Sequence, residues 1–224
     1  MTSPVVPEVA ELPGELADLM PPYDTVLGYH GDAQVAYLTF DDGPGPYTSQ
    51  VLDILAEHGV LATFCQVGNH IDDYPETQRR LIAAGHTVCN HSWDHPSGLG
   101  DAPAEVIDTE IARTEQAFGA YGVRSHWFRA PGGDFGQTTV LRQVAQARGV
   151  QPLGWAVDSQ DWRKPGVQAI VNNVMSRIEP GAIVLLHDAG GVDREQTVQA
   201  LPVIIRALQD AGYQLASLPP SGLG

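Results

Sequence analysis

Positive charge is scarce in this chain of 224 residues, where 12 Lys and Arg stand against 27 Asp and Glu, a formal net charge of −15. An acidic surface repels the phosphates of nucleic acids and of anionic membranes, so we expect neither as a partner. The sequence also lacks an apolar run of about 18 residues, which a membrane-spanning helix requires. These absences favour an acidic protein that handles neutral or cationic ligands.

The N-terminal stretch MTSPVVPEVAELPGELADLMPP lacks the basic start and the apolar segment of a signal peptide. Two locations fit: a secreted or cell-surface protein whose signal segment is absent from this sequence, which we favour, or the cytoplasm. We expect residues 1–30 to form an irregular arm. Residues 31–224 are long enough for one domain with a substantial core, and nothing argues against a monomer.

Cysteine is equally rare, with only Cys65 and Cys89 in the chain. Both end short apolar runs, LATFC and HTVC, so they can lie on neighbouring strands close enough to form a bridge. Two buried free thiols are the interpretation that we favour. The Cys-His spacing of a zinc finger is absent, which excludes that type of site.

The remaining chain alternates between two patterns. Apolar, β-branched or aromatic runs predict strands at Val35–Phe40, Val60–Val67, Thr87–Cys89, Trp127–Arg129, Gln151–Val157, Ala182–Leu186 and Tyr213–Leu218. Helical spacing predicts helices at Thr48–His58, Pro75–Ala84, Pro103–Tyr121, Thr138–Arg148, Pro165–Ile178 and Glu195–Ala211. Strands that alternate with helices indicate parallel pairing, so seven strands and six helices predict a barrel-like α/β fold.

Polar or ionisable side chains follow five of the predicted strands. They are Asp41 and Asp42, Asn90 and His91, Arg129, Asp158 with Asp161 nearby, and His187 with Asp188. In parallel α/β folds the working groups gather at the carboxyl ends of the strands. Chance could place charge at one or two ends, but five such ends indicate a functional rim.

The segment HSWDH places His91 and His95 four residues apart. On a helical turn this spacing brings both imidazoles to one metal ion, although such a pair alone is weak evidence. With a carboxylate from TFDDGP the pair becomes a two-His, one-carboxylate set that leaves positions open for water and substrate. One of Asp41 and Asp42 can then bind the metal, and the other stays free as a base.

Two further strand ends offer proton chemistry. Arg129, in FRAPGG, either forms a surface ion pair or orients the free carboxylate. His187 follows the buried run AIVLL and is either a packed core residue or a general acid. In the second case Asp161 or Asp158 would raise its pKa, which suits an acid at neutral pH.

The segments TFDDGP, HSWDH, RAPGG, DSQDW and LLHD occur in this order. Together they make the chain resemble the polysaccharide deacetylases (carbohydrate esterase family 4, the NodB homology domain) from about residue 35 to residue 218. Each motif alone is moderately specific, and five in order are strongly so. The resemblance implies a distorted (β/α) barrel of about seven parallel strands and one divalent metal ion, usually zinc, for which cobalt can substitute.

The resemblance also implies roles for individual residues. The implied metal ligands are Asp42, His91 and His95. The implied proton-transfer groups are the base Asp41, its partner Arg129, the acid His187 and its partner Asp161.

Four residues are expected to contact the substrate. The resemblance implies that Trp162 and Leu185 line the acetyl pocket and that the Gly132 N–H stabilises the oxyanion. Many family members have Tyr at the position of Gly132, which preserves the backbone chemistry but changes the groove wall. Tyr47 lies near a strand end, where an aromatic ring is more often packing but suits a sugar platform.

The resemblance implies metal-dependent hydrolysis of N-acetyl groups from an acetylated polysaccharide, with release of acetate. Chitin oligomers are the first expected substrate and peptidoglycan N-acetylglucosamine the next. O-deacetylation of acetylxylan is an alternative, because the motifs are alike. A non-catalytic carbohydrate-binding domain is disfavoured because Asp41 and His187 are both present, and the acidic charge disfavours a metallophosphatase.

Overall fold

The computed structural model describes residues 25–28 and 34–219 of the chain. Its strands are β1 (Val35–Asp41), β2 (Thr63–Gln66), β3 (Thr87–Asn90), β4 (Trp127–Phe128), β5 (Gln151–Pro152), β6 (Val157–Asp158), β7 (Ile183–His187) and β8 (Gln214–Ala216). Its α-helices are α1 (Thr48–Glu57), α2 (Pro75–Ala83), α3 (Ala104–Ala120), α4 (Val140–Ala147), α5 (Val167–Met175) and α6 (Glu195–Asp210). Four short 3₁₀ turns are η2 (Gly68–Asp73), η3 (Leu99–Asp101), η4 (Pro131–Gly133) and η5 (Asp161–Arg163).

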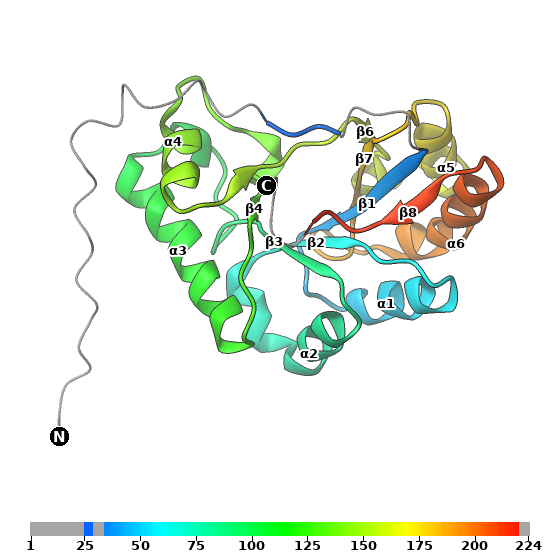
Figure 1. Ribbon diagram of the computed structural model, residues 1–224, viewed down its shortest axis with the longest axis horizontal. Helices are drawn as coiled ribbons and strands as arrows, with labels where there is room; N and C mark the ends of the chain where they lie inside the picture. Colours follow the sequence, from blue (N-terminus) through cyan, green and yellow to red (C-terminus); the bar gives the residue numbers. More distant parts are fainter. Residues whose placement is uncertain (1–24, 29–33, 220–224) are drawn as a thin grey trace.

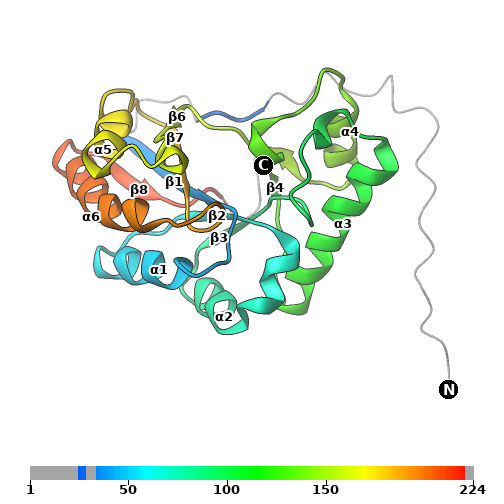
Figure 2. The same cartoon turned by 180° about the vertical axis from the view of Figure 1, so that it is seen from behind.

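The strands form one curved parallel sheet in the order β5-β4-β3-β2-β1-β7-β6, and β8 pairs with the first half of β1. Figure 1 shows α3 and α4 on one flank of this sheet, α5 and α6 on the other, and α1 and α2 between them. Figure 2 shows the same helices outside the sheet from behind. The predicted distorted (β/α) barrel is therefore confirmed.

The predicted strand Gln151–Val157 is wrong as a single strand. β5 and β6 lie at opposite edges of the sheet, and residues 153–156 carry the chain between them. The Leu153 N–H donates to the Phe128 carbonyl at one edge, and the Ala156 N–H donates to the Ile183 carbonyl at the other. An apolar run can thus leave one strand and join another, which its composition does not reveal.

Residues 25–28 lie along this crossing. The Val26 N–H donates to the Pro152 carbonyl, the Gly154 N–H donates to the Val26 carbonyl, and Gly28 forms a bridge with Ala182. This part of the expected irregular arm is therefore bonded to the edge strand β5 and to the residue that precedes β7. The rest of residues 1–30, apart from these four, lies outside the described residues, and the division into arm and domain stays a prediction.

The two faces of the strands bury different side chains. One face packs against the helices; its buried members include Leu38, Phe40, Phe64, Val184 and Leu186. The other face supplies a smaller inner cluster of Cys65, Cys89, Trp127, Leu153 and Ile183. Because successive side chains of a strand alternate between faces, Asp41 and His187 belong to the inner face. Their strands are parallel and in register, so both carboxyl ends reach one rim.

Cys65 and Cys89 form a disulfide, so the favoured interpretation of two free thiols is wrong. The two cysteines are register partners on β2 and β3 and are both fully buried on the inner face. Pairing in register places the two side chains next to each other, as the alternative of a bridge between neighbouring strands required.

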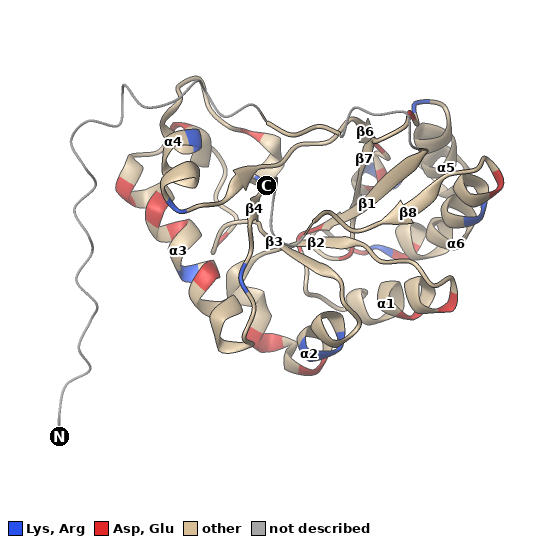
Figure 3. Ribbon diagram, viewed as in Figure 1, with Lys and Arg blue, Asp and Glu red and all other residues tan. Residues whose placement is uncertain are grey.

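Figure 3 shows acidic residues on the outer helices, with several along α3. Among the described residues no helix is long and apolar enough to cross a membrane.

Candidate active site

The adjacent carboxylates of Asp41 and Asp42 separate because the chain turns between them. Asp41 is the last residue of β1, whereas Asp42 has φ 74°, in the left-handed region. A non-glycine residue in a sparsely populated conformation of this kind costs of order 1–3 kcal/mol and is usually kept where function needs it. The turn leaves Asp41 3% exposed and gives Asp42 a side chain that is 18% exposed at the rim.

Asp42, His91 and His95 form a cluster that could hold a metal ion, since one ligand atom from each lies within 4.8 Å of the others. Asp42 Oδ1 is 3.5 Å from His91 Nε2 and 3.4 Å from His95 Nε2. Two ligands of a tetrahedral zinc ion, each about 2.1 Å from the metal, are about 3.4 Å apart. The donor types and these separations fit a zinc-like divalent ion.

The tautomer of His91 also suits a ligand. Its Nδ1 lies 2.8 Å from the Arg129 carbonyl, which only accepts, so Nδ1 carries the hydrogen and Nε2 keeps a free lone pair. Burial by itself would lower the pKa of His91, but the charges of Asp41 and Asp42 outweigh burial and raise it. Burial would raise the pKa of Asp42, yet the nearby imidazole of His91, helped by His187 and His95, lowers it to about 2.

The segment that joins His91 to His95 is not the helical turn that the spacing suggests. Ser92 and His95 both have left-handed backbones, with φ 67° and 52°. The Asn90 side chain accepts the Ser92 N–H at 2.9 Å, and the Ser92 hydroxyl accepts the His95 N–H at 3.0 Å. Side chains here replace the carbonyls of a helix, and they still bring the two rings together, with centroids 4.9 Å apart.

Glu110 on α3 supports the same segment, and the sequence analysis missed it. The N–H groups of Trp93 and Asp94 both donate to Glu110 Oε2 at 2.9 Å. Glu110 is only 8% exposed and occurs on the buried side of α3 with Ile107 and Ile111. A carboxylate on the apolar stripe of a helix is the one signal that could have identified it.

Arg129 is fully buried, which excludes a surface ion pair. Its Nη1 donates to Asp41 Oδ1 at 2.6 Å and to the Thr39 hydroxyl at 2.9 Å, and its Nη2 donates to the Gly154 carbonyl at 2.8 Å. A buried charge is stable only with such partners. Arg129 therefore fixes the orientation of the Asp41 carboxylate.

His187 pairs with Asp161 and not with Asp158. The His187 Nδ1 donates to Asp161 Oδ1 and its backbone N–H donates to Oδ2, both at 2.8 Å. Asp158 instead accepts the N–H of Gln160 in a local turn. Burial would lower the pKa of His187, but the hydrogen bond and charge of Asp161, with the charges of Asp41 and Asp42, raise it above its ordinary value.

Thr197 and Arg194, at the start of α6, also support site residues and were missed. The Thr197 hydroxyl donates to Asp161 Oδ2 at 2.8 Å. Arg194 places Nη2 3.6 Å from Asp42 Oδ2. Both are nearly fully buried, and nothing in the local sequence distinguishes them from surface residues of a helix start.

Asp188 is a buried carboxyl next to His187. The Thr48 hydroxyl donates to its Oδ2 at 2.5 Å, and a Cβ on Gly43 would lie 2.5 Å from the same carboxylate. Burial, helped by the charges of Asp42 and Asp41, raises the pKa of Asp188 to about 7. Asp188 thus packs against the turn that follows Asp42.

The expected substrate contacts lie in different environments. Leu185 is buried beside its register partner Thr39, whereas the Trp162 ring on η5 is 46% exposed. Gly132 has φ 63° with open space where a Cβ would lie. Tyr47 is half-buried just before α1. Their contacts with a substrate stay predictions.

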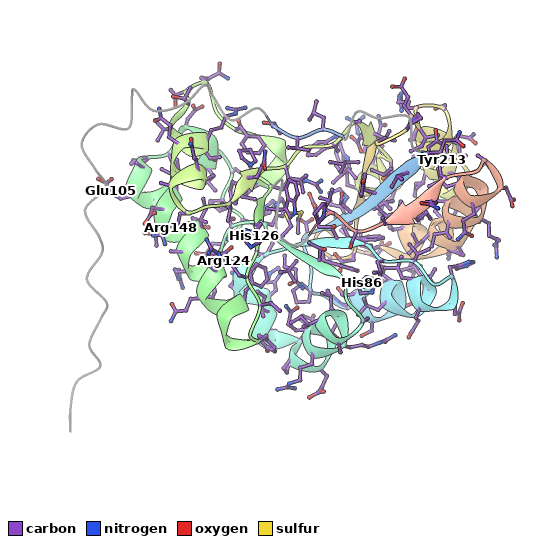
Figure 4. All side chains as sticks on the ribbon, viewed as in Figure 1. His86, Glu105, Arg124, His126, Arg148 and Tyr213 are labelled. Atoms are coloured by element: carbon purple, nitrogen blue, oxygen red, sulfur yellow. A yellow bond between two sulfur atoms is a disulfide. The ribbon has the colours of Figure 1, made fainter. Side chains whose placement is uncertain are left out.

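Other ionisable groups have structural partners outside this set. Figure 4 labels three of them, His86, Arg124 and Arg148, the last two beside α3. The Ala62 N–H donates to His86 Nδ1, and burial, with the charge of Arg80, lowers the pKa of His86 to about 4. Arg148 pairs with Asp108 on α3 and accepts a bond from Arg124 through its carbonyl.

The fold and the site together define a parallel α/β barrel with a two-His, one-Asp cluster beside a His–Asp pair. A family model described as polysaccharide deacetylase matches residues 28–153. The chain belongs to the polysaccharide deacetylase family.

Two curated relatives come from this family. A chitooligosaccharide deacetylase of Rhizobium leguminosarum bv. trifolii is 42% identical over 201 residues, which are 84% of this chain and 92% of that protein. A peptidoglycan-N-acetylglucosamine deacetylase of Bacillus cereus is 35% identical over 188 residues, 83% of this chain and 86% of that protein.

Solved structures show the same fold. A peptidoglycan N-acetylglucosamine deacetylase bound to a hydroxamate superposes with a TM-score of 0.80 at 28% identity, covering 88% of this chain and 91% of that one. A family 4 carbohydrate esterase from Streptomyces lividans in complex with acetate has a TM-score of 0.74 at 35% identity, covering 83% and 92%.

Proposed function

We propose that this protein removes N-acetyl groups from polymers or oligomers of N-acetylglucosamine, with release of acetate and with the help of one divalent metal ion. Chitin oligomers are the proposed first substrate and peptidoglycan the second, in line with the names of the two curated relatives. One observation carries the proposal: Asp41 and His187 are register partners at one rim, beside the cluster of Asp42, His91 and His95.

Asp42, His91 and His95 would hold the ion, with zinc the first candidate and cobalt a substitute. A bound divalent ion supplies Lewis acidity, which polarises the acetyl carbonyl and lowers the pKa of water to about 7. The chain itself supplies the proton transfers.

Asp41 is the proposed general base. Arg129 occupies Oδ1 of Asp41 and leaves Oδ2 facing the metal cluster, 3.6 Å from His91 Nε2. Oδ2 can therefore accept the proton of the attacking water, while the hydrogen bond from Arg129 holds the carboxylate in place.

His187 is the proposed general acid. Asp161 holds its Nδ1–H, so Nε2 is the atom that carries and donates the second proton. Amide hydrolysis needs this proton because an amide anion is a very poor leaving group. The Asp161 carboxylate, with the charges of Asp41 and Asp42, raises the pKa of His187 against the effect of burial, which favours the protonated form that an acid needs.

The acetyl group would lie against Leu185 and Trp162, with Tyr47 at the wall of the groove. The Gly132 N–H is the proposed donor to the oxyanion, a contact worth about 3–4 kcal/mol of transition-state stabilisation. The left-handed backbone of Gly132 and the open space beside its Cα are consistent with a substrate that approaches closely.

O-deacetylation of acetylxylan is the second candidate, and the likeness to a carbohydrate esterase from Streptomyces lividans favours it. A non-catalytic role is the third, since a pseudoenzyme of Bacillus anthracis has the same fold with a TM-score of 0.79 at 28% identity. The presence of Asp41, Arg129, His187 and Asp161 in bonded pairs argues against the third candidate here.

We infer that the protein acts as a monomer outside the cytoplasm, where its proposed polymers occur. The Cys65–Cys89 disulfide supports this location, because disulfides persist in oxidising compartments.

Acetate release from chitin oligomers, peptidoglycan and acetylxylan tests the proposal. The protein is assayed as purified, after chelation, and after zinc or cobalt is returned. Release from a glucosamine polymer that chelation abolishes and metal restores is the expected result. Release from acetylxylan alone would establish the esterase, and release from none of the three by metal-loaded protein would overturn the proposal.

A further inference from the structure

The loop between β7 and α6 folds back over Asp42. Gly190 has φ 67°, and a Cβ at this residue would lie only 2.2 Å from Asp42 Oδ2. Gly191, with φ 63°, would place a Cβ 3.2 Å from Arg194 Nη2. Two glycines in left-handed conformations thus bring loop backbone and the Arg194 guanidinium against the same carboxylate.

Arg194 is fixed at both sides of its guanidinium. Its Nε donates to the Ala189 carbonyl at 2.6 Å, and its Nη2 lies 3.6 Å from Asp42 Oδ2. The side chain is only 5% exposed, and within the described part of the chain Asp42 is the one carboxylate within 4.0 Å of it. Because a buried guanidinium needs a counter-charge, this ion pair orients Asp42 as well as Arg194.

The contact has the same placement as the one made by Arg129, although it is a longer ion pair, 3.6 Å against the 2.6 Å hydrogen bond between Arg129 and Asp41. Each aspartate of the pair has one oxygen against a buried arginine and the other towards His91 Nε2, at 3.6 Å for Asp41 and 3.5 Å for Asp42. We propose that Arg194 is the positioning residue of Asp42: it holds Oδ2 and so presents Oδ1 to the metal that His91 and His95 share. This inference rests on the proposed metal dependence.

The charge of Arg194 and its effect on the orientation of Asp42 should change the metal affinity in opposite directions. A cation beside the site repels a metal ion, so removal of the charge alone would tighten metal binding. Loss of an outer contact that orients a ligand typically weakens metal affinity about 10- to 100-fold. The sign of the change therefore distinguishes a positioning residue from a mere neighbouring charge.

The test is a titration of metal-free protein with Co²⁺, followed by the visible absorption of the bound ion and independent of any substrate. Arg194→Met should bind Co²⁺ about 10- to 100-fold more weakly than the unaltered protein. Arg194→Lys keeps the charge but cannot contact both Ala189 and Asp42, so it should fall between the two. Thr197→Val is the matched control, because Thr197 lies in the same helical turn but contacts Asp161; its Co²⁺ affinity should be unchanged.

Circular dichroism and thermal melting establish that each variant is folded. Equal or tighter Co²⁺ binding by folded Arg194→Met would overturn the inference. Should that variant fail to fold, the decision passes to Arg194→Lys, for which an unchanged affinity and Co²⁺ spectrum would overturn it. Failure of the unaltered protein to bind Co²⁺ would overturn the proposed metal dependence as well, which separates the two failures.

Discussion

The two halves of the rim are held together in different ways. On the proton side, bonds of 2.6 Å between Arg129 and Asp41 and of 2.8 Å between His187 and Asp161 satisfy each charge within the chain. On the metal side, Asp42 Oδ1 lies 3.5 Å from His91 Nε2 and 3.4 Å from His95 Nε2. Those separations are too long for good hydrogen bonds.

The difference shows where a cation is needed. On the proton side both charged pairs are hydrogen-bonded within the chain, although the buried Nε of Arg129 has no partner. The metal side instead gathers donors that satisfy one another poorly. Asp42 is ionised at any physiological pH, since its pKa is about 2. We therefore expect metal binding to change the metal side alone and to leave the bonded pairs of the proton side in place.

Loss of a metal ligand should have the largest effect. His95 has a side chain that is 40% exposed, so His95→Gln should fold normally and yet lose the metal. Zinc at 100 times its dissociation constant should stabilise the unaltered protein by about 2.7 kcal/mol, and this shift in thermal unfolding should vanish in the variant. Acetate release should drop to that of chelated protein. Retention of the zinc-dependent shift would contradict the assignment of His95.

Removal of the general acid His187 should have the second largest effect. It should show whether the proton side and the metal side of the rim act independently. His187→Ala should lower kcat about 10²–10⁴-fold, the usual contribution of a positioned general acid. Because His187 is not among the proposed ligands, Co²⁺ affinity should stay that of the unaltered protein. Steady-state kinetics and the Co²⁺ titration measure the two quantities in parallel. A large loss of Co²⁺ affinity would show that the halves are one unit and would break the comparison.

Removal of the charge of Asp161, the partner of His187, should have a smaller effect, which appears in the dependence of kcat on pH. His187 must be protonated to donate, so activity declines as pH rises through its raised pKa. Asp161→Asn removes the hydrogen-bonded charge that raises this pKa, and the alkaline limb of kcat should move to lower pH. A profile from pH 5 to pH 10 measures the limb. An alkaline limb that stays in place would assign it to another group.

The sequence predicted the parts of the site that depend on strand periodicity. Asp41, His91, Arg129 and His187 follow or end apolar runs, and parallel pairing brings such ends to one rim. The contacts made by Glu110 and Arg194 were not predictable in this way. Glu110 lies in α3 and Arg194 immediately precedes α6. The partner of each lies in a distant loop, at Trp93 or Asp42, and no local pattern specifies that approach.

Two errors have the same physical origin. Residues 151–157 are apolar throughout most of their length, yet hydrogen bonds to β4 and β7 divide them between opposite edges. The segment from His91 to His95 has helical spacing, yet the acceptors Asn90, Ser92 and Glu110 stabilise a non-helical path. In both cases tertiary hydrogen bonds override the local preference, and a sequence pattern does not contain them.

Asp158 provides the smallest expected effect and the sharpest control for Asp161. It lies three residues before Asp161 at the end of β6, and its Oδ1 accepts the N–H of Gln160, a bond that an Asn side chain can also accept. Asp158→Asn should therefore change kcat by no more than about twofold, equivalent to about 0.4 kcal/mol. The alkaline limb of the kcat–pH profile of Asp158→Asn should coincide with that of the unaltered protein when both profiles are recorded together. If the alkaline limb of Asp158→Asn moved as far as that of Asp161→Asn, any nearby negative charge, and not the hydrogen-bonded pair, would set the pKa of His187. If the limb stayed in place, Asp161 and not Asp158 would be the carboxylate that raises the pKa of His187.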